Sequence, residues 1–405
     1  MFKGPRLLDR GAFTQPETAP DVLSPQAREA QEIIEGYRAA KRAAMLLGKH
    51  EFFWRDHAAW FESQGYKLRP RYQIGWEPPS TGLDDVKLGD EDHLSMPRAA
   101  VVDAIRITDG KRVLLKKISK SEHPFEVEIT KLLSSDALTG DPHNCCVRLL
   151  DVLQPTDAPE ITILVFPFLQ QLTASPFDTF GEIVGFIKQI LDGLQFLHHH
   201  RIAHRDIGIP NFMMDGDEMF PGGWNAVRGR TTPRGQKHAN IYTRTQRPPR
   251  YYFIDFGLSR CFDPSDTNPL AEPIFGGDRT VPEFKTNKGA FNPFQTDIYY
   301  IGNTIREFIM KGTPSEYKGY YGTGFLEPLI RDMVQDDPAK RPTIDEVVMR
   351  FDKICRKLSS WKLRSRPIPR RGSISKGLRR HIDHWKRRID YIKQGVPPIP
   401  SRPSL

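Results

Sequence analysis

The chain has 405 residues, of which 38% are hydrophobic and 27% charged, so it is longer than one average domain. No apolar run approaches the roughly 20 residues that a bilayer span requires, and the N-terminus lacks the apolar core of a signal peptide. Four cysteines are too few for a disulfide framework. These features exclude a minidomain and a membrane-spanning protein, and they predict reduced thiols and a location in the cytoplasm or nucleus.

The net charge of +9 is unevenly distributed along the chain. Residues 356–405 hold 15 Lys or Arg against 2 Asp or Glu, a net charge of +13, so the preceding residues carry a net charge of −4. The basic character therefore belongs to a C-terminal tail, and the high isoelectric point says little about the chemistry of the rest of the chain.

The first 96 residues are expected to form an extension. Ser24 is a suitable N-cap for a helix that ends at Gly48, and a second helix is expected from Glu51 to Gln64. The following stretch is rich in Pro, Arg and aromatic residues. We expect residues 1–96 to pack on the main domain as a helical and then irregular extension.

From Val101 the pattern becomes that of strands. VVDAIRIT and KRVLLKKIS flank the dipeptide Asp109-Gly110, which suits a tight hairpin turn, and a further apolar strand spans residues 161–169. After Thr173 the apolar residues recur at helical spacing: Ile183, Ile187, Ile190, Leu194 and Leu197, then Ile298, Ile301, Ile305 and Phe308. Strands followed by helices predict an α+β fold with a small β-rich lobe and a larger helical lobe.

Two short motifs carry the chemistry. HRDIGIPN spans residues 204–211, and DFG follows at residues 255–257. Phosphoryl transfer requires that phosphates and metal ions be held in place, and that a group accept the proton of the attacking hydroxyl. We expect Asp206 to face the substrate hydroxyl, and Asn211 to bind Mg²⁺ together with Asp255 through hard oxygen ligands.

These motifs resemble the catalytic loop and the metal-binding motif of eukaryotic protein kinases, and the resemblance covers residues 101–355. It implies a bilobal kinase-like fold with ATP and Mg²⁺ as cofactors. VLLK, which ends at Lys116, is similar to the third-strand motif V-A-I-K and makes Lys116 the expected ligand of the α and β phosphates. Its expected partner is Glu128, because Leu132 then falls on the same helix face, with Glu126 as the alternative.

Further motifs follow in the order that kinases show. ILVFPFL resembles the strand and hinge of cyclin-dependent kinases, which implies Phe166 as gatekeeper and contacts of Pro167 and Leu169 with adenine. VPE and DPAKRPT imply a buried ion pair between Glu283 and Arg341. Other residues that match kinase motifs are Arg205, counted with the catalytic residues, and His204, Phe256, Gly257 and Asp297, counted as structural. We expect the kinase-like domain to span residues 97–355.

The chain departs from the kinase pattern in three places. No G-x-G-x-x-G precedes Lys116, Gly208 stands where most Ser/Thr kinases have lysine, and a basic insert of residues 216–250 separates the two catalytic motifs. The insert, together with the stretch 53–72, resembles a group of kinase-like proteins expanded in mushroom-forming fungi. Its arginines either hold an acidic substrate or a phosphorylated segment, or form a solvated loop.

The basic tail is expected to contain an amphipathic helix within residues 374–396, with the apolar stripe Leu378, Ile382, Trp385, Ile389 and Ile392. Such a helix can dock on its own kinase lobe, lie on anionic lipid, or bind an acidic, calmodulin-like partner, whereas nucleic acid is not expected. Arg205 suggests an activation segment ordered by phosphate, with Ser259, Ser265, Thr267 and Thr280 as candidate positions. Ser373 resembles a target of basophilic kinases.

The motifs together predict a kinase that transfers the γ-phosphoryl group of ATP to a protein hydroxyl, on Ser or Thr before Tyr. Two alternatives stay open. The missing glycine-rich loop favours a pseudokinase scaffold that binds nucleotide weakly or not at all. A small-molecule kinase would share the catalytic loop and the metal pair, but the activation-segment motif VPE and Arg341 argue against it.

Overall fold

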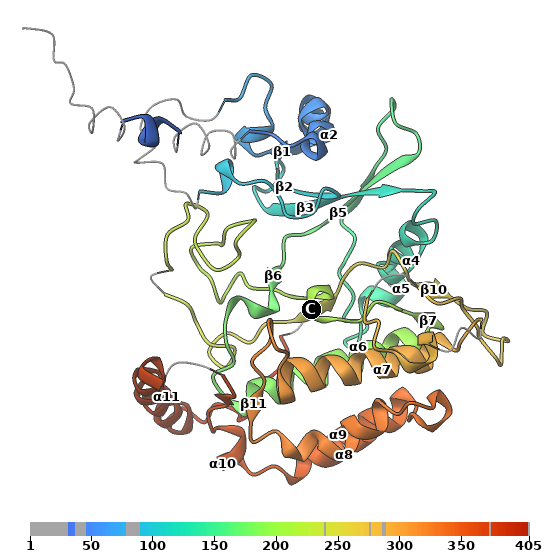
Figure 1. The fold of residues 1–405 in the computed structure, drawn as a ribbon, viewed down its shortest axis with the longest axis vertical. Coiled ribbons are helices and arrows are strands. Elements are labelled where there is room, and N and C mark those ends of the chain that lie inside the picture. Colours follow the sequence, from blue (N-terminus) through green and yellow to red (C-terminus); the bar gives the residue numbers. More distant parts are fainter. Residues whose placement is uncertain are drawn as a thin grey trace, which may run out of the picture. The chain divides into compact units, whose positions relative to one another are not determined.

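The computed structural model describes residues 31–36, 46–77, 90–238, 240–274, 277–285, 289–371 and 374–403. The chain divides into two compact units, one formed by Met1–Leu46 and Glu77–Asp85, the other by Leu47–Trp76 and Val86–Leu405. In the first unit residues 31–36 are helical, and the helix expected from Ser24 lies mostly outside the described residues. The second unit, whose ribbon is shown in Figure 1, contains every strand of the described residues.

A five-stranded antiparallel sheet forms one half of this unit, with the strand order β1-β2-β3-β5-β4. Its strands are β1 (Tyr66–Leu68), β2 (Val101–Arg106), β3 (Arg112–Ser119), β4 (Asp151–Leu153) and β5 (Ile161–Pro167). The predicted hairpin joins β2 to β3 in a register that sets Val101 opposite Lys116. Gly110 in the turn has φ 69°, a conformation that glycine adopts without strain. We call this half the sheet lobe.

Residues before the expected domain boundary complete the sheet lobe. β1 pairs with β2, and the helices α2 (Phe52–Asp56) and α3 (Ala58–Ser63) bury Trp54 and Phe61 in the same hydrophobic core as the strands. The predicted domain start at residue 97 stays a prediction, but residues Leu47–Trp76 supply an edge strand and core side chains of this lobe.

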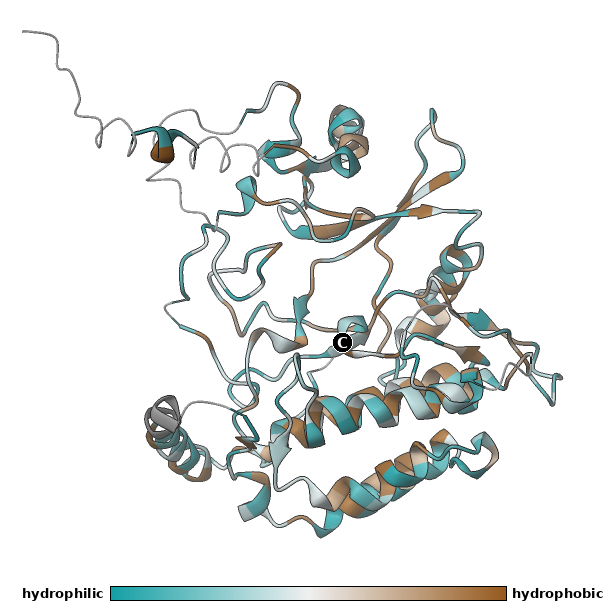
Figure 2. Ribbon diagram, in the orientation of Figure 1, coloured by the Kyte–Doolittle hydropathy of each residue, from teal (hydrophilic) through white to brown (hydrophobic). Residues whose placement is uncertain are grey.

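The other half of the unit, which we call the helical lobe, surrounds a long buried helix. This lobe contains α6 (Phe180–His199), α7 (Pro293–Ile305) with its π-helical continuation η7 (Arg306–Lys311), α8 (Glu327–Met333) and α9 (Ile344–Lys357). The five apolar positions predicted for α6 are all buried, and Figure 2 shows hydrophobic and hydrophilic stripes alternating along these helices. Thr179 caps α6 by accepting a hydrogen bond from Glu182 N at 3.1 Å.

Further helices, short strands and single turns complete the unit. The remaining helices are α4 (Glu126–Leu133), α5 (Asp136–Thr139), α10 (Ser360–Leu363) and α11 (Ile374–Lys393). The short strands are β6 (Gln170–Gln171), β7 (Ile202–Ala203), β8 (Phe212–Met214), β9 (Tyr251–Phe253), β10 (Arg260–Cys261), β11 (Tyr320–Tyr321) and β12 (Ile368–Pro369). Single 3₁₀ turns are η1 (Lys49–Glu51), η2 (Pro70–Tyr72), η3 (Glu91–His93), η4 (Leu172–Ala174), η5 (Ile209–Asn211), η6 (Pro282–Lys285), η8 (Gly324–Leu326) and η9 (Pro338–Lys340).

The arrangement confirms the predicted α+β class with a small sheet lobe and a larger helical lobe, which Figure 1 shows as two groups of elements. Within the described ranges, none of the helices has both the length and the apolar character needed to cross a bilayer.

The basic tail docks on the helical lobe. In α11, Arg387 binds Asp178 at 2.6 Å, and the hydroxyl of Tyr391 lies 2.8 Å from the hydroxyl of Thr243. These contacts come from the polar side of the helix, so its apolar residues Ile382, Trp385, Ile389 and Ile392 stay exposed. The side chains of residues 374–380, including Leu378, and the candidate Ser373 lie outside the described residues.

The last described residues run along α6. A Cβ on Gly181 would lie 1.7 Å from the carbonyl oxygen of Pro398, so only glycine permits this close approach. Further along, Arg402 contacts Cys145 Sγ at 2.6 Å, and Arg250 donates to the Pro403 carbonyl at 3.1 Å. The C-terminal residues are therefore packed into the helical lobe.

The structure brings Glu283 and Arg341 together inside the helical lobe. Two hydrogen bonds of 2.8 and 2.6 Å join the guanidinium to the carboxylate, and both side chains are buried. Thr296 adds a third bond to Glu283 at 3.0 Å. The pair fixes the turn η6, which ends the segment after DFG, to the helices beneath it.

Replacing Arg341 by Met should lower the free energy of unfolding by about 3–5 kcal/mol, because a buried carboxylate loses its partner. The matched control is Arg350→Met, which removes a pair with Asp332 that is about one-third exposed, and it should cost about 0–1 kcal/mol. Urea denaturation of both variants measures the difference. Equal losses would contradict the importance assigned to the buried pair.

Candidate active site

A cavity of about 350 Å³ lies between the two lobes. Leu114 and Lys116 of β3 line it from the sheet lobe, and Ile254 and Asp255, which follow β9, line it from the helical lobe. The residues predicted to contact adenine also line it: Phe166, Pro167 and Leu169. Its volume lies within the range of about 300–1,000 Å³ that is typical of small-molecule sites.

Lys116 connects the two lobes. Its Nζ lies 2.7 Å from Asp255 Oδ1 and also binds Glu126 Oε1. Burial alone would lower the pKa of Lys116, but the two carboxylates outweigh it and raise that pKa. The lysine is therefore held as a cation at the inner end of the cavity.

The prediction of Glu128 as the partner of Lys116 is wrong, and the alternative Glu126 occupies that place. The buried face of α4 consists of Glu126, Ile129, Thr130 and Leu133, whereas Glu128 is exposed and Leu132 is 43% exposed. The error was in which face of the helix is buried, because we expected Leu132 to point inward. Ile129 and Leu133, three and seven residues after Glu126, were the better signal.

The catalytic-loop motif forms one hydrogen-bonded unit. The side-chain amide of Asn211 donates to the Asp206 carbonyl at 2.7 Å and to Asp206 Oδ2 at 2.8 Å. Asp297 accepts from the backbone amides of His204 and Arg205, both at 2.8 Å. These two bonds support the left-handed backbone of Arg205, whose φ of 68° is rare outside glycine and is typical of functional sites.

Asp255 lies beside this unit and also has a left-handed backbone, with φ 67°. Burial would raise the pKa of Asp255, but the positive charges of Lys116 and Arg98 outweigh burial and hold that pKa below its usual value. The next residue, Phe256, is buried with its ring 5.3 Å from that of His204. The motif is thereby anchored in the core of the helical lobe.

The backbone of the segment that follows the DFG motif lies over Asp206 at Gly277. Gly277 has φ 66°, and a Cβ there would come within 2.6 Å of Asp206 Oδ1, so a larger residue would be strained and would press on the carboxylate. Gly208, which adopts an extended backbone, offers no polar side chain at the position where most Ser/Thr kinases have lysine.

Arg205 uses its guanidinium to hold the same segment. It donates to the Leu258 carbonyl at 3.2 Å and also to the Glu272 carbonyl. Of the candidate phosphorylation positions, Ser259 is fully buried and donates to the His204 carbonyl at 3.0 Å, which removes it as a candidate in this conformation. The other three, Ser265, Thr267 and Thr280, are exposed.

The donor chemistry fits the predicted Mg²⁺. Asn211 and Asp255 offer an amide oxygen and a carboxylate, and magnesium in phosphate-binding sites takes one or two protein carboxylates together with phosphate oxygens and water. In the part of the chain that the structure describes, no group of three or more His, Cys, Asp or Glu that could hold a metal occurs.

The sequence pattern gave no sign of two further contributions to the cavity. Arg98, just before β2, lines it and has Nη1 3.6 Å from Asp255 Oδ2. Trp224, Ala226 and Gly229 of the insert also line it. The only available signal for a contribution to the cavity was position: Arg98 lies in the stretch before β2, and the other three residues lie in the insert.

The relatives that comparison with known proteins gives here are protein kinases. Serine/threonine-protein kinase ICK of Rattus norvegicus is 24% identical over 260 residues, covering 60% of this chain and 41% of that protein. The CTD kinase subunit alpha of Schizosaccharomyces pombe is 28% identical over 186 residues, with 44% and 31% covered. Mitogen-activated protein kinase 13 of Mus musculus is 29% identical over 167 residues, with 38% and 42% covered. No family model matches the chain.

The chain thus spans less than half the length of these curated relatives. The chain is thus similar in sequence to eukaryotic protein kinases at 24–29% identity, and its bilobal α+β architecture is compatible with a kinase-like fold. The finer resemblance to a fungal group stays a prediction.

The pairing of Lys116 with Glu126 can be tested without any ligand. Glu126→Gln removes a charge that raises the pKa of Lys116, so the neutral amine fraction at mildly alkaline pH should rise about tenfold for each unit by which the pKa falls. Mass spectrometry after brief labelling with an amine-reactive ester measures the effect on Lys116. The control Glu128→Gln should leave its labelling rate unchanged, and an equal increase in both variants would refute the pairing.

Proposed function

We propose that the chain is an enzyme that transfers the γ-phosphoryl group of ATP to a hydroxyl group of a protein, on Ser or Thr. The observation that carries this proposal is that Lys116 and Asp255 line the cavity and bind each other, while Asn211, which is hydrogen-bonded to Asp206, accepts from the amide of Ile254, the residue before Asp255, at 3.1 Å. These groups come from both lobes and are the residue types that phosphoryl transfer requires.

The roles follow from chemistry and position. The substrate oxygen forms a bond to the γ phosphorus, the bond from that phosphorus to the β-γ bridging oxygen breaks, and ADP leaves with the bridging oxygen. Asp206 accepts the hydroxyl proton. Lys116, kept in place by Glu126, binds the α and β phosphates as a cation. Asn211 and Asp255 would hold Mg²⁺, which supplies positive charge against the phosphate oxygens when bound.

A pseudokinase scaffold is the second candidate, and two observations favour it. No glycine-rich loop is present, and Asp255 is already engaged by Lys116 and Arg98. A small-molecule kinase is disfavoured by the buried pair of Glu283 and Arg341, which anchors an activation segment of the protein-kinase type.

We further propose a protein substrate, and a cytoplasmic or nuclear location. An acidic partner or anionic lipid for the tail stays part of this proposal. A partner for the tail is supported by the exposed apolar stripe of α11, which Lys386 and Lys393 flank.

An ATP-turnover assay with Mg²⁺ tests the enzyme. Asp206→Asn should lower the rate by about 10²- to 10⁴-fold, because the proton acceptor is lost, and Lys116→Met should also lower it strongly. Glu128→Gln, whose side chain points to solvent, is the matched control and should keep the wild-type rate. Background turnover in the wild type and in all variants would favour the scaffold.

The pH dependence of turnover should report on Asp206. Burial raises the pKa of Asp206, and the charge of Asp255 adds to this, while His204 and Asn211 act in the opposite direction with smaller effect. A raised pKa keeps the carboxyl protonated to a higher pH, and the protonated form cannot accept the hydroxyl proton. The rate should therefore fall on acidification with a midpoint above that of an ordinary aspartate. A rate that stays flat down to that ordinary value would contradict the assignment.

A further inference from the structure

Residues 90–98 belong to the stretch before Lys116 in which the resemblance to protein kinases implies a glycine-rich loop. Such a loop joins the first two strands of the sheet, and here residues 69–100 join β1 to its antiparallel neighbour β2. The end of this connection reaches the cavity, because Met96, Pro97 and Arg98 line it. The backbone amides that a glycine-rich loop would offer to phosphates are replaced by a segment that carries a guanidinium.

Arg98 is placed beside the proposed phosphate position. Its Nη1 lies 3.6 Å from Asp255 Oδ2, while Lys116 Nζ lies 2.7 Å from the other oxygen of the same carboxylate. Two cations therefore flank Asp255 at the cavity. The Arg98 side chain is 54% exposed, so its remaining donors are accessible to a ligand. A guanidinium can bind phosphate oxygens through two parallel hydrogen bonds, which a lysine cannot do.

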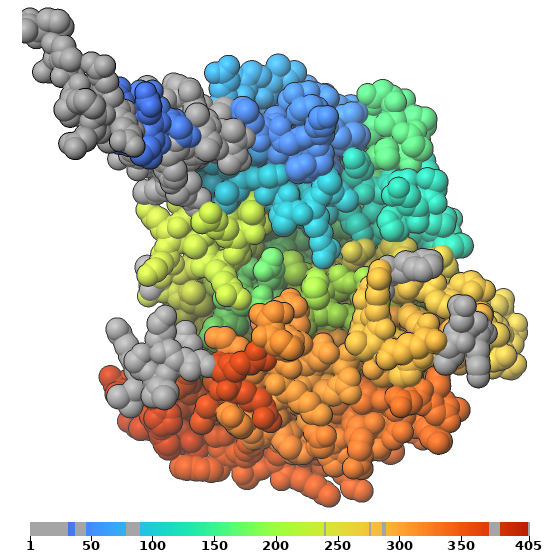
Figure 3. Space-filling model, in the orientation of Figure 1, coloured from blue at the N-terminus to red at the C-terminus, as the bar shows by residue number. Residues whose placement is uncertain are grey.

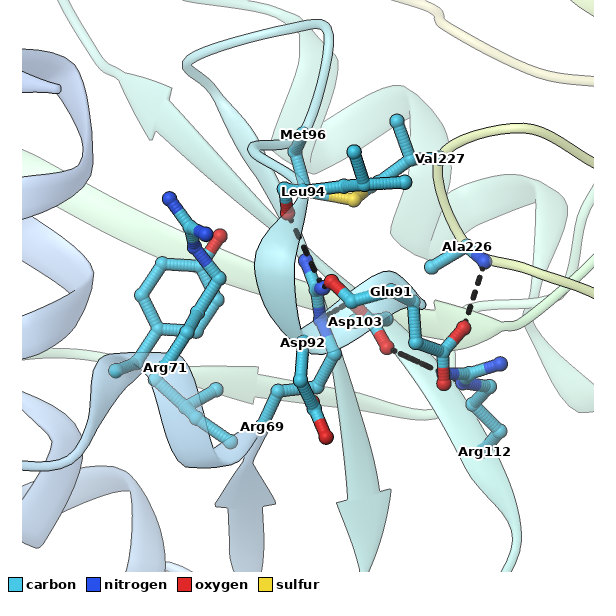
Figure 4. Close-up of polar contacts among 12 residues, drawn as sticks. Arg69, Arg71, Glu91, Asp92, Leu94, Met96, Asp103, Arg112, Ala226 and Val227 are labelled. Carbon is cyan, nitrogen blue, oxygen red and sulfur yellow. Dashed lines mark hydrogen bonds and ion pairs between the residues drawn. The ribbon is translucent and has the colours of Figure 1, made fainter. Parts of the chain in front are cut away.

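A buried chain of charges holds the segment that carries Arg98 (Figure 4). Arg69 Nε lies 2.8 Å from Asp103 Oδ1, and the other oxygen of Asp103 accepts from Arg112 Nε at 3.1 Å. Arg112 in turn pairs with Glu91 in η3. Arg69 also donates to the Leu94 carbonyl at 3.2 Å. Four alternating charges, three from strands or their ends and one from η3, thus hold the backbone of residues 91–94, shortly before Arg98.

The insert closes this arrangement from the other lobe. Glu91 Oε2 accepts from the amide of Ala226 at 2.9 Å, and the amide of Glu91 donates to the Pro233 carbonyl at 3.0 Å. Arg112 Nη1 donates to the Trp224 carbonyl at 2.9 Å. Figure 3 shows the insert, in yellow-green, on the surface between the two lobes. The segment 90–98 is therefore held from both lobes.

We propose that Arg98 binds the phosphates of the nucleotide and takes over the task of the missing glycine-rich loop. This proposal rests on the proposed function, because it assigns a further residue to the same site. The contacts of residues 90–94 restrain the backbone that leads to Arg98, and its guanidinium lies 3.6 Å from Asp255, so part of the ordering that binding requires is present before the ligand arrives.

Calorimetric titration of the full chain with three ligands tests the proposal: ADP, adenosine and tripolyphosphate. Arg98→Ala should weaken ADP and tripolyphosphate by about 10- to 100-fold, the range expected for lost charge-assisted hydrogen bonds, and leave adenosine unchanged. Arg98→Lys should recover only part of the loss. The matched control is Arg331→Ala, on α8, whose side chain is 70% exposed, and it should bind all three ligands as the wild type does.

The outcomes distinguish the role of Arg98 from the proposed function. Unchanged or tighter ADP binding in Arg98→Ala would overturn the role of Arg98 and leave the proposed function standing. A wild type that binds tripolyphosphate in an Arg98-dependent way but neither adenosine nor ADP would support the role of Arg98 and refute the ATP site. A wild type that binds none of the three would overturn both. Thermal melting of each variant shows whether it is folded.

Discussion

The ion pair between Lys116 and Asp255 is the interaction on which the candidate site depends, because it joins β3 of the sheet lobe to the segment after β9. Each partner is fixed by its own lobe: Lys116 by Glu126 on α4, and Asp255 by the buried Phe256 that follows it. Taking two charges out of water is costly unless both are paired and hydrogen-bonded. The cost of desolvating the two charges is offset only when the lobes are close enough for Lys116 and Asp255 to pair. The pair therefore favours one relative placement of the catalytic groups.

A second link between the lobes runs along the outer side of the cavity. The charges of Arg69, Asp103, Arg112 and Glu91 form a continuous buried series, and it ends on backbone groups of the insert. Because buried charges must be satisfied, removing any member would leave its neighbour uncompensated. Two departures from the kinase pattern are thus in contact: the insert supports residues 90–98, the segment that lacks the usual glycines.

The order of strands and helices in the sequence predicted the two lobes. That Lys116, Asp206, Asn211 and Asp255 share one site was expected only because their motifs resemble those of protein kinases. The prediction of Glu128 as the partner of Lys116 was wrong because a short amphipathic helix can turn either of two faces toward the core. Only the packing of Ile129 and Leu133 decides between these two orientations. Arg98 could not be found, since its role depends on contacts between segments far apart in the chain. The same holds for the charge series, in which Arg69 meets Asp103 through the pairing of β1 with β2.

The packing of the final residues along α6 has a practical consequence for anyone preparing this protein. The recognisable motifs end near α9, so a recombinant fragment designed from them would stop there. Such a fragment would uncover the groove at Gly181 that Pro398 fills and would leave Cys145 without the arginine that covers it. Poor solubility of a shortened fragment would then reflect a missing part of the hydrophobic core rather than an intrinsically unstable catalytic domain.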